Sequence, residues 1–241
     1  MLVNSYIFKK DSIDITNLKA YYTMEGNAND IVGGHNGTVT NGSFVTGKIG
    51  QGFSGDGNQD YIRTPANAVF NMGNGSTETA FSWDGWFKFN DNGQQAWLIC
   101  KRNTGTGNQD FDLQFYETGL YWAVYSDGAT SNYFRVSYPW TPTVGEWYHI
   151  ATSYDASKTA AGMKLYVNGV DVGTSAVTGT YNNILGNNTP VTIGAFSLQL
   201  TSTTRSFDGV TDNVKLWHEV LTPEKIAAII AKEESGQLIT V

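Results

Sequence analysis

The chain has 241 residues with a single cysteine, and 15 Lys and Arg against 22 Asp and Glu give it a net charge of −7. One cysteine excludes an internal disulfide framework, and we expect Cys100, which ends an apolar run, to be a buried thiol. The sequence has no basic run, which argues against nucleic acid and against an anionic membrane surface as partners.

Residues 1–17 are expected to form an arm before a domain over residues 18–234, and residues 235–241 a tail. In the arm, residues 3–8 have the composition of an edge strand and residues 9–14 are charged and irregular. Within the domain, short β-branched and aromatic runs alternate with Gly, Asn, Asp and Ser, which predicts many strands. They are expected at residues 18–24, 52–53, 60–64, 80–89, 96–102, 111–116, 120–126, 133–138, 147–154, 163–167, 170–174, 191–196 and 212–217.

Two local signals stand out in this series. Asn168-Gly169 supplies the two residues with positive φ that a tight type I′ hairpin requires. Near the C-terminus, Thr222 and Pro223 are a helix cap and a first helical residue, and Ser235-Gly236 is a stop. Between them, isoleucines three and four residues apart predict one apolar helix face: Ile226, Ile229 and Ile230. Short strands with one helix predict an all-β sandwich.

The segment from Gly145 to Thr174 resembles the WxHVAxxYD…LYVNGxxVG signature of laminin G-like (LamG) jelly rolls, within the concanavalin A-like lectin/glucanase group. Further segments resemble this family in the same order: residues 18–22, 30–38, 53–62, 81–87, 207–217 and 221–226. The resemblance implies an all-β, two-sheet antiparallel jelly-roll sandwich with one short C-terminal helix. Two residues depart from the pattern: Thr211 replaces an apolar residue, and Asn213 replaces an acid.

The same resemblance implies a structural Ca²⁺ between two segments, with Asp30 and Asp212 as ligands and Asn36 as a further one. Calcium takes six to eight oxygens, and the loop from Asp30 through Asn36 supplies a carboxylate, carbonyls and an amide. The alternative is that Asp30 caps its own turn while Asp212 satisfies buried backbone amides.

Aromatic residues are the candidates for ligand binding. Trp97, Trp122, Trp140 and Tyr181 lie in or beside expected loops, where flat rings stack on sugars or anchor protein interfaces. The alternative is that these rings only cover the sheet edges. The chain has no E-x-D-x-x-E segment of the kind that laminarinase-like glycosidases carry, and its three histidines have no metal-binding spacing. We therefore expect a protein that is not an enzyme.

These observations predict a non-catalytic recognition module that binds a glycan or a protein surface. The alternatives are a structural decoration or fibre protein of a bacteriophage particle, attached through residues 1–17, and a disfavoured glycoside hydrolase or lyase. The N-terminus lacks a signal-peptide pattern, and no segment reaches the roughly 18 apolar residues of a membrane span. We expect an extracellular or virion location without a classical signal peptide, with a cytoplasmic one left open. Ligand and oligomeric state are also left open.

Overall fold

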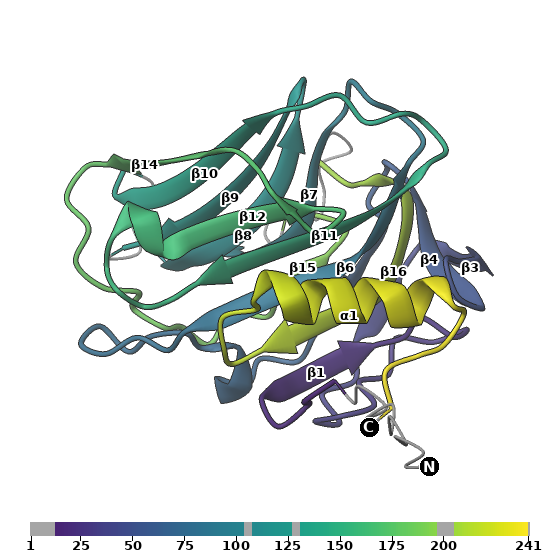
Figure 1. Cartoon of the computed structure of the whole chain (residues 1–241), viewed down its shortest axis with the longest axis horizontal. Coiled ribbons are helices and arrows are strands. Elements are labelled where there is room, and N and C mark those ends of the chain that lie inside the picture. The colour runs from purple at the N-terminus through teal and green to yellow at the C-terminus, as the bar shows by residue number, and fades with distance from the viewer. Residues whose placement is uncertain (1–12, 104–107, 127–130, 197–204, 241) are drawn as a thin grey trace, which may run out of the picture.

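The computed structural model describes residues 13–103, 108–126, 131–196 and 205–240, and in this part of the chain two antiparallel sheets pack face to face (Figure 1). The first sheet has the strand order β13 (Val170–Asp171), β12 (Met163–Val167), β11 (Trp147–Tyr154), β6 (Phe81–Phe89), β16 (Asp208–Trp217), β4 (Gln51–Asp56) and β3 (Ser43–Thr46), with β1 (Leu18–Tyr22) also paired to β16. The second has the order β14 (Thr174–Thr178), β10 (Tyr133–Pro139), β9 (Gly119–Tyr125), β8 (Asn108–Tyr116), β7 (Gln95–Asn103), β15 (Thr192–Ile193), β5 (Tyr61–Arg63) and β2 (Thr38–Thr40).

The main core lies between the sheets because both follow the two-residue period of β-strands. From the first sheet, β6 contributes Phe81, Trp83, Phe87 and Phe89, which are all fully buried. Phe81 meets Phe111 and Trp122 of the second sheet at ring-centroid distances of 5.2 and 5.6 Å. The architecture confirms the predicted all-β sandwich.

Two of the predicted local features are confirmed, and one strand is not. Asn168 and Gly169 have φ angles of 49° and 80°, and they join β12 to β13 as a tight hairpin. The strand predicted over residues 170–174 is wrong: it is divided between β13 in the first sheet and β14 in the second. Gly173, at φ 87°, adopts the left-handed conformation at which the chain changes sheets.

Asn213 lies at a bulge of β16, where the pairing with β6 shifts between Asp212 and Lys215. Its φ of 52° is left-handed, which Asn tolerates better than most residues. Its amide oxygen accepts the Tyr21 hydroxyl at 2.6 Å, and its amide nitrogen donates to Asp212 at 3.0 Å. The bulge explains why an amide stands where the family pattern has an acid.

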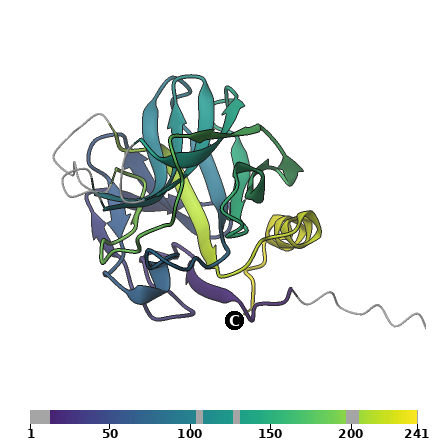
Figure 2. The same cartoon turned by 90° about the vertical axis from the view of Figure 1, so that its left-hand side faces the viewer.

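The outer face of the first sheet is covered by α1 (Pro223–Glu234), which appears end-on beside the sandwich in Figure 2. Ile226 and Ile229 of α1 pack against Tyr21 and Trp217 of the sheet. The predicted helix signals are confirmed: the Thr222 hydroxyl accepts from the Lys225 N–H at 3.3 Å, and the helix ends at Ser235 followed by left-handed Gly236. The described residues also contain the short 3₁₀ turns η1 (Ala68–Phe70) and η2 (Ala160–Gly162).

Described residues from both terminal segments contact this helix-covered cluster. Ile13 and Ile15 pack against it, and Ile239 is 2% exposed within it. Of the expected arm, residues 1–12 lie outside the described residues, as does residue 241 of the expected tail. The proposed boundaries at residues 17 and 235 stay predictions.

Candidate functional site

Asp30, the first predicted calcium ligand, serves as the anchor of its own loop. Its carboxylate accepts backbone N–H groups of Tyr21 at 2.9 Å, Val32 at 3.0 Å, Gly33 at 3.1 Å and His35 at 3.0 Å. Burial by itself would raise the pKa of Asp30, but these backbone hydrogen bonds hold it below its ordinary value. The His35 ring nitrogen Nδ1 also lies 3.0 Å from the carboxylate.

Asp212, the second predicted ligand, is fully buried at the bulge of β16. Its Oδ2 accepts the backbone N–H groups of Lys48 at 2.8 Å and Ile49 at 3.0 Å, from the turn between β3 and β4. Burial raises the pKa of Asp212 to about 7, although these two hydrogen bonds oppose the rise. Asp212 therefore ties the turn to the sheet.

The three predicted ligands do not fit a calcium ion as they are arranged. The Asn36 amide oxygen accepts the backbone N–H of Asp30 at 3.1 Å, so all three side chains already face N–H donors. Calcium needs oxygens that converge on one point, and the described residues contain no cluster of three His, Cys, Asp or Glu able to hold a metal. The contacts match the alternative reading, in which the two aspartates satisfy backbone amides. Calcium binding stays a prediction from the sequence.

The four aromatic residues expected to form a rim are not brought together. Trp122 is fully buried in the main core, where its Nε1 donates to the Ser153 carbonyl at 3.3 Å. Tyr181 stacks on Phe134 at 3.9 Å between ring centroids, and Trp140 packs edge-on against Tyr148 at 4.9 Å. Of the four, Trp97 lines a pocket in the described part of the chain.

That pocket lies on the outer face of the second sheet and has a volume of about 360 Å³. We call it the sheet pocket. Strands β7, β8, β9 and β10 contribute its lining, which consists of Gln95, Trp97, Gln114, Tyr116, Tyr121 and Arg135. Strand register puts Trp97 opposite Gln114, and Gln114 opposite Tyr121, so these three form one row across the sheet. The pocket combines flat rings with amide and guanidinium donors.

Trp97 and Tyr121 form aromatic walls of the sheet pocket. Trp97 is 4% exposed and packs on Phe196 at 4.7 Å, with the guanidinium carbon of Arg205 at 5.3 Å from its ring. Its indole Nε1 has no hydrogen-bond acceptor among the described residues. Tyr121 leans over Gly119, where an added Cβ would lie 2.7 Å from the Tyr121 hydroxyl. A glycine at this position therefore leaves the space that the tyrosine occupies.

Four of the lining residues were not site candidates at the level of the sequence: Gln95, Gln114, Tyr116 and Arg135. The signal that identifies them is alternation: in β8, Phe111, Leu113 and Phe115 enter the core, so Gln114 and Tyr116 face outward. The same period in β9 and β10 puts Tyr121 and Arg135 on that outer face. Only the pairing of the strands reveals that these outward residues share one pocket.

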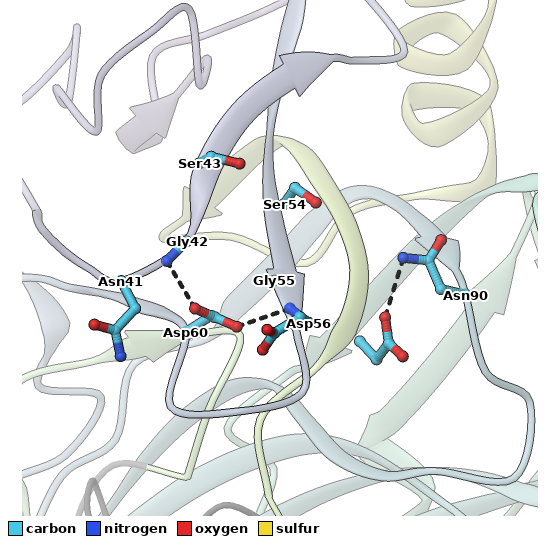
Figure 3. A pocket seen from close by; sticks show the side chains of 9 residues that line it. Asn41, Gly42, Ser43, Ser54, Gly55, Asp56, Asp60 and Asn90 are labelled. Carbon is cyan, nitrogen blue, oxygen red and sulfur yellow. Dashed lines mark hydrogen bonds between the residues drawn. The ribbon is translucent and has the colours of Figure 1, made fainter.

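A second, strongly polar pocket of about 500 Å³ lies where β3, β4 and β16 meet (Figure 3). Asp60 points between two backbone N–H groups, accepting from Gly42 and from Asp56 at 2.7 Å each. The pKa of Asp56 is raised, chiefly by a side-chain hydrogen bond with Asp60. Burial alone would raise the pKa of Asp60 as well, but the hydrogen bonds from Asp56 lower it. Such separation is typical of acid–base pairs. Here, however, Asp60 is 5% exposed and closes the turn between β4 and β5, while Asp208 accepts from Asn90 at 3.0 Å.

Comparison with protein families gives one match: residues 56–227 fit the model Laminin_G_3, described as the Concanavalin A-like lectin/glucanases superfamily. Comparison with curated protein sequences gives no match. The described residues contain no helix that is both long and apolar enough to span a membrane.

Among solved structures, the chain is similar to the binding domain of Paraclostridial Mosquitocidal Protein 1, with 17% identity, a TM-score of 0.66 and coverage of 88% of this chain and 51% of that one. It is similar to Domain 4 of AbnA, a GH43 extracellular arabinanase from Geobacillus stearothermophilus in complex with arabinotriose, with 19% identity, a TM-score of 0.63 and coverage of 88% and 98%. It is also similar to the botulinum neurotoxin serotype G binding domain, with 14% identity, a TM-score of 0.64 and coverage of 88% of this chain and 50% of that one. The chain thus spans about half of the toxin binding domains. At these identities the likeness establishes the fold.

Proposed function

The chain belongs to the concanavalin A-like lectin/glucanase superfamily, and from this premise we propose that it is a non-catalytic module that binds glycans in the sheet pocket. The observation that carries the proposal is the lining of that pocket: one Trp, two Tyr, two Gln and one Arg on a rigid sheet. Aromatic rings stack on the apolar faces of sugars, while amide and guanidinium groups hydrogen-bond their oxygens. The proposal moves ligand binding from the loops to the sheet face.

The absence of catalysis is part of the proposal. Glycoside hydrolysis needs two carboxyl groups on either side of the scissile bond, and the lining of the sheet pocket contains none. In the polar pocket, Asp60 is occupied by backbone N–H groups and Asp208 by Asn90. The similar domain from AbnA in complex with arabinotriose and the toxin binding domains support a binding role.

The place where the module acts is a finer part of the proposal. We propose display outside the cell, supported by the description of AbnA as an extracellular arabinanase and by the toxin origin of the other similar domains. The alternative of a bacteriophage structural protein depends on residues 1–17, most of which lie outside the described part, and stays a prediction from the sequence.

The proposal is tested by screening the protein on an array of neutral and charged glycans and measuring the affinity of each hit by calorimetry. Tyr121→Ala removes a wall of the pocket and should weaken every hit by about tenfold or more. Trp147→Ala is the matched control, because Trp147 is a partly exposed ring in β11 of the first sheet. Equal losses in the two variants, or no glycan bound at all, would contradict the proposed function.

A further inference from the structure

Arg135 is a cation in the sheet pocket without an anionic partner. Its guanidinium carbon lies 5.1 Å from the ring centre of Tyr121 and 5.7 Å from that of Tyr133. Neither an ion pair nor a hydrogen bond joins its guanidinium to any of the described residues. Stacking against rings fixes the position of a guanidinium but leaves its in-plane N–H donors available.

The neighbours of Arg135 on the sheet keep this space open. Register puts Ala123 of β9 on one side of it and Ala176 of β14 on the other. Both are small, so neither fills the space beside the longer arginine side chain. Arg135 is partly exposed, which leaves its head group within reach of a ligand.

The acid nearest to Arg135 by register already has partners. Asp112 of β8 is paired with Ala123, so it lies two strands from Arg135, or roughly 10 Å between backbones. Its carboxylate forms an ion pair with Arg102 and accepts the Tyr125 hydroxyl at 3.1 Å. Arg102 on this outer face thus has an acidic partner, whereas Arg135 has none among the described residues.

The other lining residues of the pocket supply a ring and further donors. Among the described residues the indole N–H of Trp97 has no acceptor, but this atom is closed off from the pocket, so Trp97 contributes its ring to the wall. The lining adds the amide groups of Gln95 and Gln114 but no acid. The pocket is therefore rich in donors although the chain carries a net charge of −7.

We infer that the ligand of the sheet pocket is an acidic glycan whose sugar carboxylate is bound by Arg135. This inference rests on the proposed function, since it names the class of glycan. A carboxylate fits the planar fork of a guanidinium, with one hydrogen bond to each of its two oxygens, and the sugar hydroxyls meet the other donors. A sulfated sugar would use the same charge but without the planar match.

The test compares wild type with Arg135→Gln on an array that holds uronic-acid, sialic-acid, sulfated and neutral glycans, followed by calorimetry on the hits. Wild type should prefer carboxylated glycans, and Arg135→Gln should lose about ten- to hundredfold in affinity for them while keeping its affinity for neutral ones. Arg63→Gln is the matched control: Arg63 is an exposed arginine of β5 in the same sheet, and it lines a different pocket. Its affinities should equal those of wild type.

The outcomes separate the two levels of the proposal. If wild type prefers neutral glycans, or if Arg135→Gln keeps the preference for carboxylated ones, the inference fails while glycan binding stands. A stronger response to sulfated than to carboxylated glycans overturns the assignment of a carboxylate. If no glycan binds, the proposed function itself fails and the inference fails with it.

Discussion

Lys215 on the outer face of the first sheet and Arg135 on that of the second differ in whether the described residues give them an acidic partner. Under α1, on the first sheet, Lys215 lies 3.0 Å from Asp84 and 2.8 Å from Glu233. Two indoles complete this cluster, with Nε1 of Trp86 donating to Glu233 at 2.8 Å and Nε1 of Trp217 donating to Asp84 at 2.6 Å. Burial alone would lower the pKa of Lys215, but the two carboxylates raise it. The cluster is closed, charged and occupied by its own partners.

On the second sheet, no helix of the described residues covers the outer face, and Arg135 in the sheet pocket has no acidic partner in that part of the chain. This difference separates polar groups that hold the fold together from those that can bind a ligand. Polar groups that satisfy one another hold an element in place, here α1 on the first sheet. A partly exposed cation that lines a pocket and has no acidic partner among the described residues is available to a ligand.

The largest effect is expected from breaking the closed cluster. Lys215→Met leaves Asp84 and Glu233 buried without their cation, and should lower the free energy of unfolding by about 3–5 kcal/mol. Lys164→Met is the control, because the Lys164–Asp171 pair is 47% exposed on both sides and should cost less than about 1 kcal/mol. Urea unfolding measures both. Similar losses would mean that the cluster does not anchor the helix.

A matched pair of tryptophans sharpens the comparison. Trp86→Phe removes an N–H that donates to the buried carboxylate of Glu233, whereas Trp97→Phe removes an N–H without an acceptor. Both substitutions remove the same side-chain volume. Trp86→Phe should therefore lower the free energy of unfolding by about 1.5–3 kcal/mol more than Trp97→Phe, because it also removes a hydrogen bond to a charged group. The two unfolding midpoints give this difference. If Trp97→Phe lowers the free energy of unfolding more than Trp86→Phe does, the N–H of Trp97 has an acceptor outside the described residues.

Asp212 extends the comparison to pH. Because burial raises its pKa from 3.8 to about 7, the folded state binds more protons than the unfolded state between these values. The contribution of Asp212 to stability therefore falls as pH rises through this window, by no more than about 1.4 kcal/mol per pH unit. Thermal melting across the window should show wild type losing stability relative to Asp212→Asn as pH rises. An advantage of wild type that grows with pH would contradict the shift.

The smallest effect is expected from calcium. Asp30 and Asp212 belong to the class of satisfied groups, since both accept backbone N–H hydrogen bonds. The melting temperature should therefore be the same in millimolar calcium and in EGTA. If calcium raises the melting temperature of wild type but not that of Asp30→Asn or Asp212→Asn, the metal site that the sequence resemblance implies would be supported.

Local features of the fold were predictable from the sequence, whereas the pocket was not. The Asn168-Gly169 turn and the Thr222 cap depend on residues only a few positions apart, so the sequence alone is enough to predict them. The pocket depends on which strands pair and which face each presents. In β9 a step of one residue separates Tyr121, in the pocket, from Trp122, in the core. In β7 a register shift between Trp97 and Ile99 interrupts the alternation that would have assigned their faces.

The most direct test of the account follows the backbone and indole N–H signals of the protein by NMR while the strongest glycan from the array is added. Shifts are expected only in β7, β8, β9 and β10, including the indole signal of Trp97, which Trp97→Phe identifies by its loss. Signals from α1 and the Lys215 cluster should not move. Shifts that gather around Trp140 or along α1 instead, with the Trp97 signal unchanged, would contradict the assignment of the second sheet as the binding face.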